Sequence, residues 1–99
     1  MNIKVQSIHF DADKKLLDFI DEKVGKLSQY YDDILTAEVF LKLDNNNTIE
    51  NKIVDIKLNI PGKTLFASDQ SKAFEQSVDE SVDNLRRQVT KHKQKIRGL

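Results

Sequence analysis

The stretch TAEVFLKLDNNNTIENKIVDIKLNIPGKTLFAS, residues 36–68, alternates apolar and polar side chains in three successive segments. Alternation with a period of two is typical of a β-strand that buries only one of its faces. The polar tip DNNNT separates the first two segments, as in a hairpin. The sequence therefore predicts three consecutive strands with one solvated face, over residues 36–43, 52–60 and 63–68.

Pro61 and Gly62 separate the second and third of these strands. Proline fixes a negative φ and glycine tolerates a positive one, so the pair suits the two central positions of a type II turn. We therefore expect the third strand to fold back on the second, which completes an antiparallel meander.

In the chain before the meander, the spacing of the apolar residues changes from every second position to every third or fourth position. NIKVQSIHF alternates and predicts a strand over residues 2–9, with an irregularity near its end. In DADKKLLDFIDEKVGKLSQYY the apolar residues recur every three or four positions, which predicts an amphipathic helix over residues 13–29, with Asp11 or Asp13 as its N-cap. Gly25 inside this helix indicates either close packing or a tolerated glycine.

A second helical pattern follows the meander and predicts a helix over residues 70–97, with Ser68 or Asp69 as its cap and Gly98 just past its end. The predicted order is β-α-β-β-β-α, and neither a linker nor an internal repeat interrupts it. Because each element has one apolar side, we expect an α+β sandwich in which both helices cover one face of a four-stranded, mainly antiparallel sheet. Residues 1–99 then form a single domain.

Charge is distributed unevenly along the chain. The formal net charge is zero, but all 16 acidic residues lie at or before Asp83. Residues 86–99 carry no acid and six cations. The six cations are Arg86, Arg87, Lys91, Lys93, Lys95 and Arg97. A segregated basic surface can bind a polyanion even in a neutral protein, because the ligand responds to the local field.

Two interpretations of this basic end are open. Cations near a helix C-terminus complement its dipole, but that effect acts mainly within the last turn, and it explains Lys95 and Arg97 better than Arg86 and Arg87. The six cations extend over roughly three turns and surround most of the exposed circumference of the predicted helix. This arrangement suits a groove walled by phosphates.

Three further residues carry two interpretations each. Lys23 and Lys26 are neighbours on the first predicted helix, either as ordinary solvated lysines or as an extension of the basic surface if the two helices pack side by side. His92 lies at an apolar position of the second helix, where a packing role is the more common one, although a protonated imidazole can also contact phosphate.

Catalytic chemistry finds little support in the sequence. The chain has no cysteine, its three glycines are scattered, and its two histidines, His9 and His92, are near opposite ends. We therefore predict no catalytic residue, no metal site, no cofactor and no small-molecule substrate. No apolar run approaches the roughly 18 residues that a membrane span needs, and we expect a cytoplasmic protein without a membrane partner.

The segments EKVGKLSQYYDDILTAEVFL, GKTLFASDQSKAF and DNLRRQVTKHKQK together resemble the ribosome hibernation-promoting factor and ribosome-associated inhibitor family. The resemblance covers nearly the whole chain, and its most specific part is the pattern L-x-R-Q-x-x-K-H-K-x-K from Leu85 to Lys95. It implies a fold similar to double-stranded RNA-binding domains. The chain is most similar to the short-form hibernation-promoting factors, which lack an additional C-terminal domain.

The resemblance also implies a function. It implies binding between the head and body of the small ribosomal subunit, contact with ribosomal RNA, and competition with messenger and transfer RNA in non-growing cells. The basic positions of the family fall on Lys23, Lys26, Arg87, Lys91, Lys93 and Lys95, with Arg86 as an addition. A general double-stranded RNA-binding module is the alternative, and a small enzyme of an unfamiliar kind is a third candidate.

Overall fold

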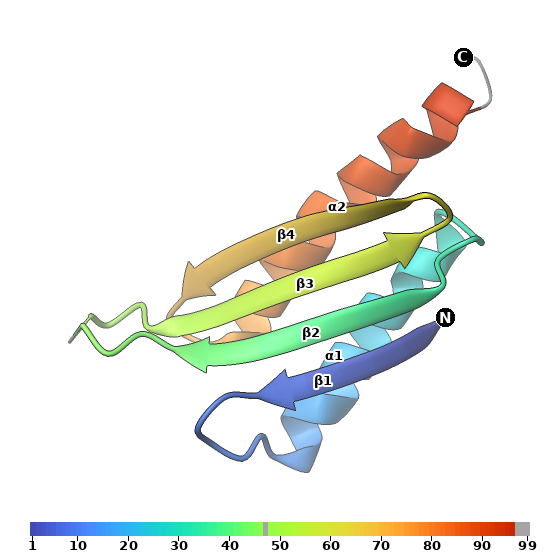
Figure 1. Cartoon of the computed structure of the whole chain (residues 1–99). Coiled ribbons are helices and arrows are strands. Elements are labelled where there is room, and N and C mark those ends of the chain that lie inside the picture. The colour runs from blue at the N-terminus through green and yellow to red at the C-terminus, as the bar shows by residue number, and fades with distance from the viewer. Residues whose placement is uncertain (47, 97–99) are drawn as a thin grey trace.

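A computed structural model describes residues 1–46 and 48–96 and confirms the predicted order of elements (Figure 1). The strands are β1 (Asn2–Ser7), β2 (Thr36–Leu43), β3 (Lys52–Ile60) and β4 (Lys63–Ser71). The helices are α1 (Lys14–Gly25), the short 3-10 helix η1 (Lys26–Gln29) and α2 (Phe74–Ile96).

The four strands form one sheet in the order β1-β2-β3-β4. β2, β3 and β4 pair antiparallel, which confirms the predicted meander, while β1 pairs parallel with β2. Parallel neighbours need a crossover connection, and α1 with η1 supplies it. At the turn between β3 and β4, Gly62 has a φ of +75°, a value that glycine adopts without strain and that a type II turn requires.

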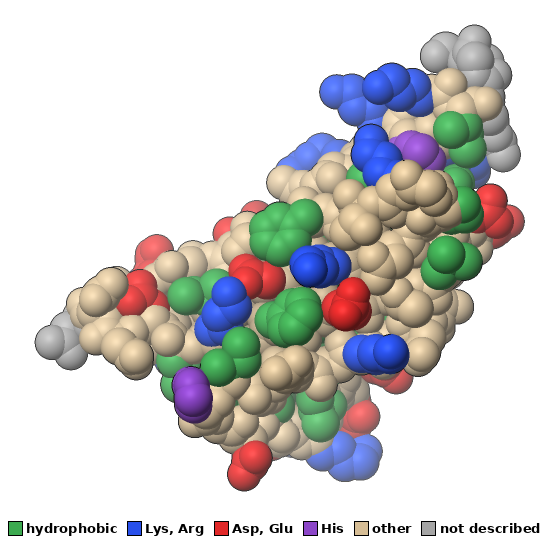
Figure 2. Space-filling model, in the orientation of Figure 1, with side chains coloured by type: hydrophobic (Ala, Val, Ile, Leu, Met, Phe, Trp, Pro, Cys, Tyr) green, Lys and Arg blue, Asp and Glu red, His purple; other side chains and the backbone are tan. Residues whose placement is uncertain are grey.

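Both helices cover the same face of the sheet, as predicted (Figure 1). The inward side chains of the strands and the apolar stripes of the helices form one core. Its fully buried members include Ile20, Val24, Leu27, Leu41, Val54, Ile56, Leu58, Val78, Leu85 and Val89. The opposite face of the sheet is solvated and mixes acidic, basic and apolar side chains (Figure 2).

The first helix begins where the sequence predicts. Of the two proposed N-caps, Asp13 is the cap, because its Oδ1 accepts a hydrogen bond of 2.9 Å from the Leu16 amide. The predicted helix over residues 13–29 divides into α1 and the tighter η1. A Cβ on Gly25 would meet its nearest neighbour, Ile3 Cδ1, at 4.0 Å, so this glycine is tolerated and no close approach demands it.

The first strand is shorter than predicted and ends at Ser7 instead of residue 9. His9 has a φ of +67°, and a residue in this left-handed region turns the chain out of the extended conformation. The predicted irregularity near the strand end is therefore located at His9.

The boundary between β4 and α2 differs from the prediction. β4 continues to Ser71 because Ser68 and Asp69 pair with Asp55 and Val54 of β3. Neither residue caps a helix, and α2 begins at Phe74 instead of residue 70. Pairing across the sheet prevails here over the local capping tendency of serine and aspartate. The predicted helix end at Arg97 and Gly98 lies outside the described residues.

Two segments of α2 differ in their burial. We call Phe74–Val89 the proximal segment and Thr90–Ile96 the distal segment. All five buried residues of α2 belong to the proximal segment, and they are Ser77, Val78, Ser81, Leu85 and Val89. Ser77 also donates from Oγ to the Lys52 carbonyl of β3, at 2.7 Å, and so fixes the helix to the sheet. The distal segment extends beyond the end of the sheet (Figure 1).

Candidate nucleic-acid interface

The structure brings the predicted lysines of the first helix next to the second helix. Lys23, at the end of α1, and Lys26, in η1, line a groove of about 190 Å³ that also includes Tyr30 and Arg86. We call it the α1–α2 groove. The two helices therefore pack side by side. This packing is the condition under which the two lysines extend the basic surface of α2.

Tyr30 is an exposed aromatic residue of this groove that was absent from the predicted site. The residue is 41% exposed, and the Arg86 guanidinium lies over its ring at 5.8 Å from the ring centroid. An aromatic ring beside a guanidinium is a surface on which an unpaired base can stack. The helical spacing in the sequence places Tyr31, and not Tyr30, with the apolar residues, and the structure confirms that Tyr31 is the buried one of the pair.

The cations of the α1–α2 groove have carboxylate partners. Lys23 lies 3.6 Å from Asp79 of α2, and Lys26 lies 3.7 Å from Glu22. Asp83 forms ion pairs with both arginines. Its Oδ1 lies 2.9 Å from a guanidinium nitrogen of Arg86, and its Oδ2 lies 2.5 Å from one of Arg87. Hydrogen bonds from Arg86 and Arg87 hold the pKa of the Asp83 carboxyl below its ordinary value, and the same contact raises the pKa of Arg86.

The distal segment carries three cations of a different kind. No carboxylate among residues 1–46 and 48–96 lies within 4.0 Å of the amines of Lys91, Lys93 or Lys95. We call these three residues the distal cluster. Figure 2 shows lysine and arginine side chains gathered over this end of α2, whereas on the sheet face the two signs of charge are mixed.

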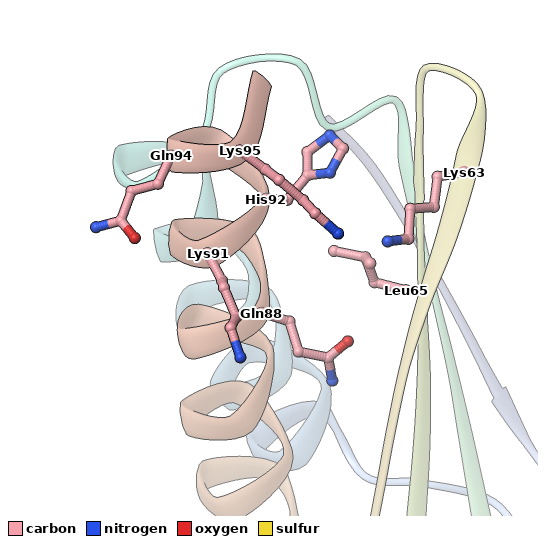
Figure 3. Close-up of a pocket in the computed structure, with 7 residues that line it drawn as sticks. All are labelled: Lys63, Leu65, Gln88, Lys91, His92, Gln94 and Lys95. Carbon is pink, nitrogen blue, oxygen red and sulfur yellow. The ribbon is translucent and has the colours of Figure 1, made fainter. Parts of the chain in front are cut away.

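A second hollow lies between the start of β4 and α2, on the side of α2 away from the α1–α2 groove. This β4–α2 cleft has a volume of about 370 Å³ (Figure 3). Its lining residues are Lys63, Leu65, Gln88, Lys91, His92, Gln94 and Lys95. Lys63 was absent from the predicted site, because nothing in the local sequence of a hairpin indicates that a distant helix end lies opposite it.

His92 packs as the sequence predicted and also lines this cleft. Its ring meets that of the buried Tyr31 edge-on, with centroids 5.6 Å apart and an interplanar angle of 87°. The packing interpretation is therefore confirmed. The side chain is half-buried, so part of the imidazole remains on the surface of the cleft.

The arrangement suits a multiply charged anion. Exposed ion pairs contribute only about 0–1 kcal/mol each, so a phosphate can replace the carboxylates of the groove at little cost. The distal cluster needs no such exchange. Within the residues that the structure describes, no group of three or more histidine, cysteine, aspartate or glutamate side chains is placed to hold a metal ion. No helix there is long and apolar enough to cross a membrane.

Comparisons with known proteins point to ribosome factors. The family model for Sigma 54 modulation protein / S30EA ribosomal protein matches residues 3–97. A ribosome hibernation promoting factor of Pseudomonas putida is 27% identical over 99 residues, which is all of this chain and 93% of that protein.

Two solved structures are similar in fold. One is a ribosomal subunit interface protein from Coxiella burnetii, with a TM-score of 0.84 and 24% identity, over 94% of this chain and 98% of that one. The other is the N-terminal domain of Thermus thermophilus Protein Y, with a TM-score of 0.80 and 25% identity, over 93% of this chain and 99% of that one. Both similarities agree with the four-stranded sheet and two helices described above.

Proposed function

The chain belongs to the Sigma 54 modulation protein / S30EA ribosomal protein family, and we propose from this that it is a hibernation factor that binds the small ribosomal subunit at the decoding channel and silences idle ribosomes. The Pseudomonas putida relative is named a ribosome hibernation promoting factor, and the Coxiella burnetii protein is named a ribosomal subunit interface protein. The protein acts in the cytoplasm, where the ribosomes are.

The observation that carries this proposal is the distal cluster, at the end of a helix that extends beyond the sheet (Figure 1). Lysines that have no carboxylate partner among the described residues gain most from phosphate contacts, because each contact releases condensed counterions from the nucleic acid. A projecting helix also enters a channel more easily than a flat surface does. We assign the phosphate contacts with ribosomal RNA to Lys91, Lys93 and Lys95, and further contacts to Lys23, Lys26, Arg86 and Arg87.

The proposed mechanism is occupancy. The protein fills the channel that messenger and transfer RNA must enter, and no bond is made or broken. Occupancy is governed by mass action, so high concentrations of the competing RNAs should displace the protein. Displacement should leave the ribosomal RNA intact and the ribosome active.

Sedimentation of purified protein with ribosomal subunits tests the proposal. We expect the protein to sediment with small subunits, to remain in the supernatant with large subunits, and to bind naked duplex RNA much more weakly than small subunits. Equal affinity for naked duplex RNA would contradict the proposal and favour a general double-stranded RNA-binding module.

Competition tests the mechanism. Adding messenger and initiator transfer RNA to the complex should release the protein from the small subunit and restore translation in proportion to their concentration. Cleaved ribosomal RNA, or inhibition that persists after the protein has been removed at high salt, would contradict occupancy and favour an enzyme.

A further inference from the structure

The β4–α2 cleft joins two walls that are distant in sequence. Lys63 opens β4 directly after the turn at Pro61 and Gly62, and Lys95 lies in the last described turn of α2. Figure 3 shows the amines of Lys63 and Lys95 pointing toward one another across the cleft, with Leu65 beside them. Lys91 lies one turn before Lys95 on the same side of the helix.

The charge of the cleft is of one sign. Three of its seven lining residues are lysines and none is an acid. In the part of the chain that the structure describes, no carboxylate lies within 4.0 Å of any of these three amines. Ammonium groups that face one another repel, and an anion between them converts this repulsion into attraction.

The other lining residues give the cleft a fixed shape. The Gln88 side-chain amide donates to the Phe66 carbonyl at 2.8 Å and to Asn84 Oδ1 at 2.6 Å. Both of its hydrogens are therefore engaged, which leaves its oxygen as an acceptor. Leu65 is only 5% exposed, and His92 is held by its contact with Tyr31. An apolar wall, a fixed amide and an imidazole edge provide surfaces for the sugar and base that accompany a phosphate.

We propose that the β4–α2 cleft is a binding site for the phosphate group of a nucleotide, held between Lys63 and Lys95, with Lys91 one helical turn away on the same wall of the cleft. The nucleoside lies against Leu65 and His92. The volume of about 370 Å³ lies within the range of roughly 300–1,000 Å³ that is typical of small-ligand sites. The site itself rests on the geometry of the cleft, and only the assignment of the phosphate to ribosomal RNA rests on the proposed function.

Nuclear magnetic resonance of the labelled full chain tests this proposal directly. The chain is titrated separately with inorganic phosphate, adenosine monophosphate, adenosine and a short single-stranded oligoribonucleotide. We expect the nucleotide and the oligoribonucleotide to shift the backbone amides around Lys63 and Lys95, with a weaker effect of inorganic phosphate and none of adenosine. Equal effects of adenosine and its monophosphate, or shifts confined to other surfaces, would overturn the proposal.

Substitution of Lys63 makes the test specific, because this residue lies outside α2. Lys63→Gln should weaken binding of adenosine monophosphate about tenfold. This factor corresponds to the lower end of the free energies that hydrogen bonds to charged groups contribute. Lys63→Arg should retain most of the affinity. The matched control is Lys57→Gln, which removes one exposed positive charge from the open face of the same sheet. If Lys63→Gln and Lys57→Gln bind the nucleotide equally well, the site is refuted.

The source of the phosphate follows from the same titrations. Tighter binding of the oligoribonucleotide than of the mononucleotide indicates an RNA phosphate, whereas the reverse order indicates a free nucleotide. Sedimentation of Lys63→Gln with small subunits separates this proposal from the proposed function. If the variant and the wild type both sediment with small subunits but neither binds a nucleotide, the cleft proposal alone fails.

Discussion

The two segments of α2 have the same secondary structure but differ in burial and in the sign of their net charge. The proximal segment, Phe74–Val89, contains every buried residue of the helix, and its four acids and two arginines give it a net charge of −2. The distal segment, Thr90–Ile96, buries no residue, and its three lysines give it a net charge of +3. One continuous helix thus anchors itself through its first part and offers charge through its second.

A neutral protein can present a positive surface to a polyanion when its charges are separated along one helix in this way. In the proximal segment the carboxylates of Asp79 and Asp83 already balance Lys23, Arg86 and Arg87. Such pairs must exchange partners before they contribute to RNA binding. The lysines of the distal cluster add their attraction without that exchange. Stability and affinity should therefore respond to substitutions in different segments of the same helix.

The largest effect is expected from loss of a buried side chain in the proximal segment. Leu85 is fully buried between α2 and the sheet. Leu85→Ala should lower the free energy of unfolding by about 2–5 kcal/mol, because it removes apolar contacts and leaves a cavity. Denaturant unfolding followed by circular dichroism measures this change.

Ile96→Ala is the matched control in the distal segment. Ile96 is 59% exposed, so this apolar truncation should change the free energy of unfolding by less than about 0.5 kcal/mol. Comparable destabilisation by the two substitutions would mean that the distal segment is anchored as firmly as the proximal one, and the comparison between the segments would fail.

A smaller effect, on affinity instead of stability, is expected from neutralising the distal cluster. The triple variant Lys91→Gln, Lys93→Gln, Lys95→Gln should bind small subunits about a hundredfold more weakly at physiological salt, since three phosphate contacts are lost. The slope of log affinity against log salt should also become shallower by roughly 2 to 3. Sedimentation across a series of salt concentrations measures both quantities.

The control for net charge neutralises three exposed lysines elsewhere, in the variant Lys4→Gln, Lys15→Gln, Lys57→Gln. It should retain nearly full affinity. If both triple variants lose affinity equally, the total charge and not the distal cluster governs binding. The distal variant should also unfold like the wild type, because none of its three residues is buried.

The fold was predictable wherever a local pattern determines it. The alternation in residues 36–60 determines β2 and β3, and both strands have the predicted bounds. The start of α2 was predicted wrongly because Ser68 and Asp69 resemble helix caps locally, while their pairing with β3 depends on a register that only the assembled sheet provides.

The candidate site was predictable as a set of cations and not as a geometry. The sequence indicated a basic helix, but it could not distinguish Arg86, which Asp83 holds, from Lys95, which lacks a carboxylate partner among the described residues. The pair Lys23 and Asp79 depends on packing between two helices. Lys63 faces Lys95 only because β4 and α2 meet at the same end of the sheet (Figure 3).

The smallest effect, on affinity for small subunits, is expected from substitution of Asp83, the carboxylate that pairs with both arginines of the proximal segment. Asp83 accepts hydrogen bonds from both Arg86 and Arg87, and these bonds lower its pKa, so the group stays charged throughout the neutral range. Asp83→Asn should release both guanidinium groups and remove a negative charge from the surface that we propose for RNA binding. Because exposed ion pairs are weak, we expect affinity for small subunits to rise only about two- to fivefold.

Glu80→Gln is the matched control for this substitution, since it removes an exposed carboxylate of the same segment for which no cation partner is found among the described residues. An equal gain from both variants would attribute the effect to net charge alone. A loss of affinity in Asp83→Asn would reverse the interpretation, because Asp83 would then hold the arginines in position for RNA. The proximal segment would in that case contact the RNA directly, and binding would not be confined to the distal segment of α2.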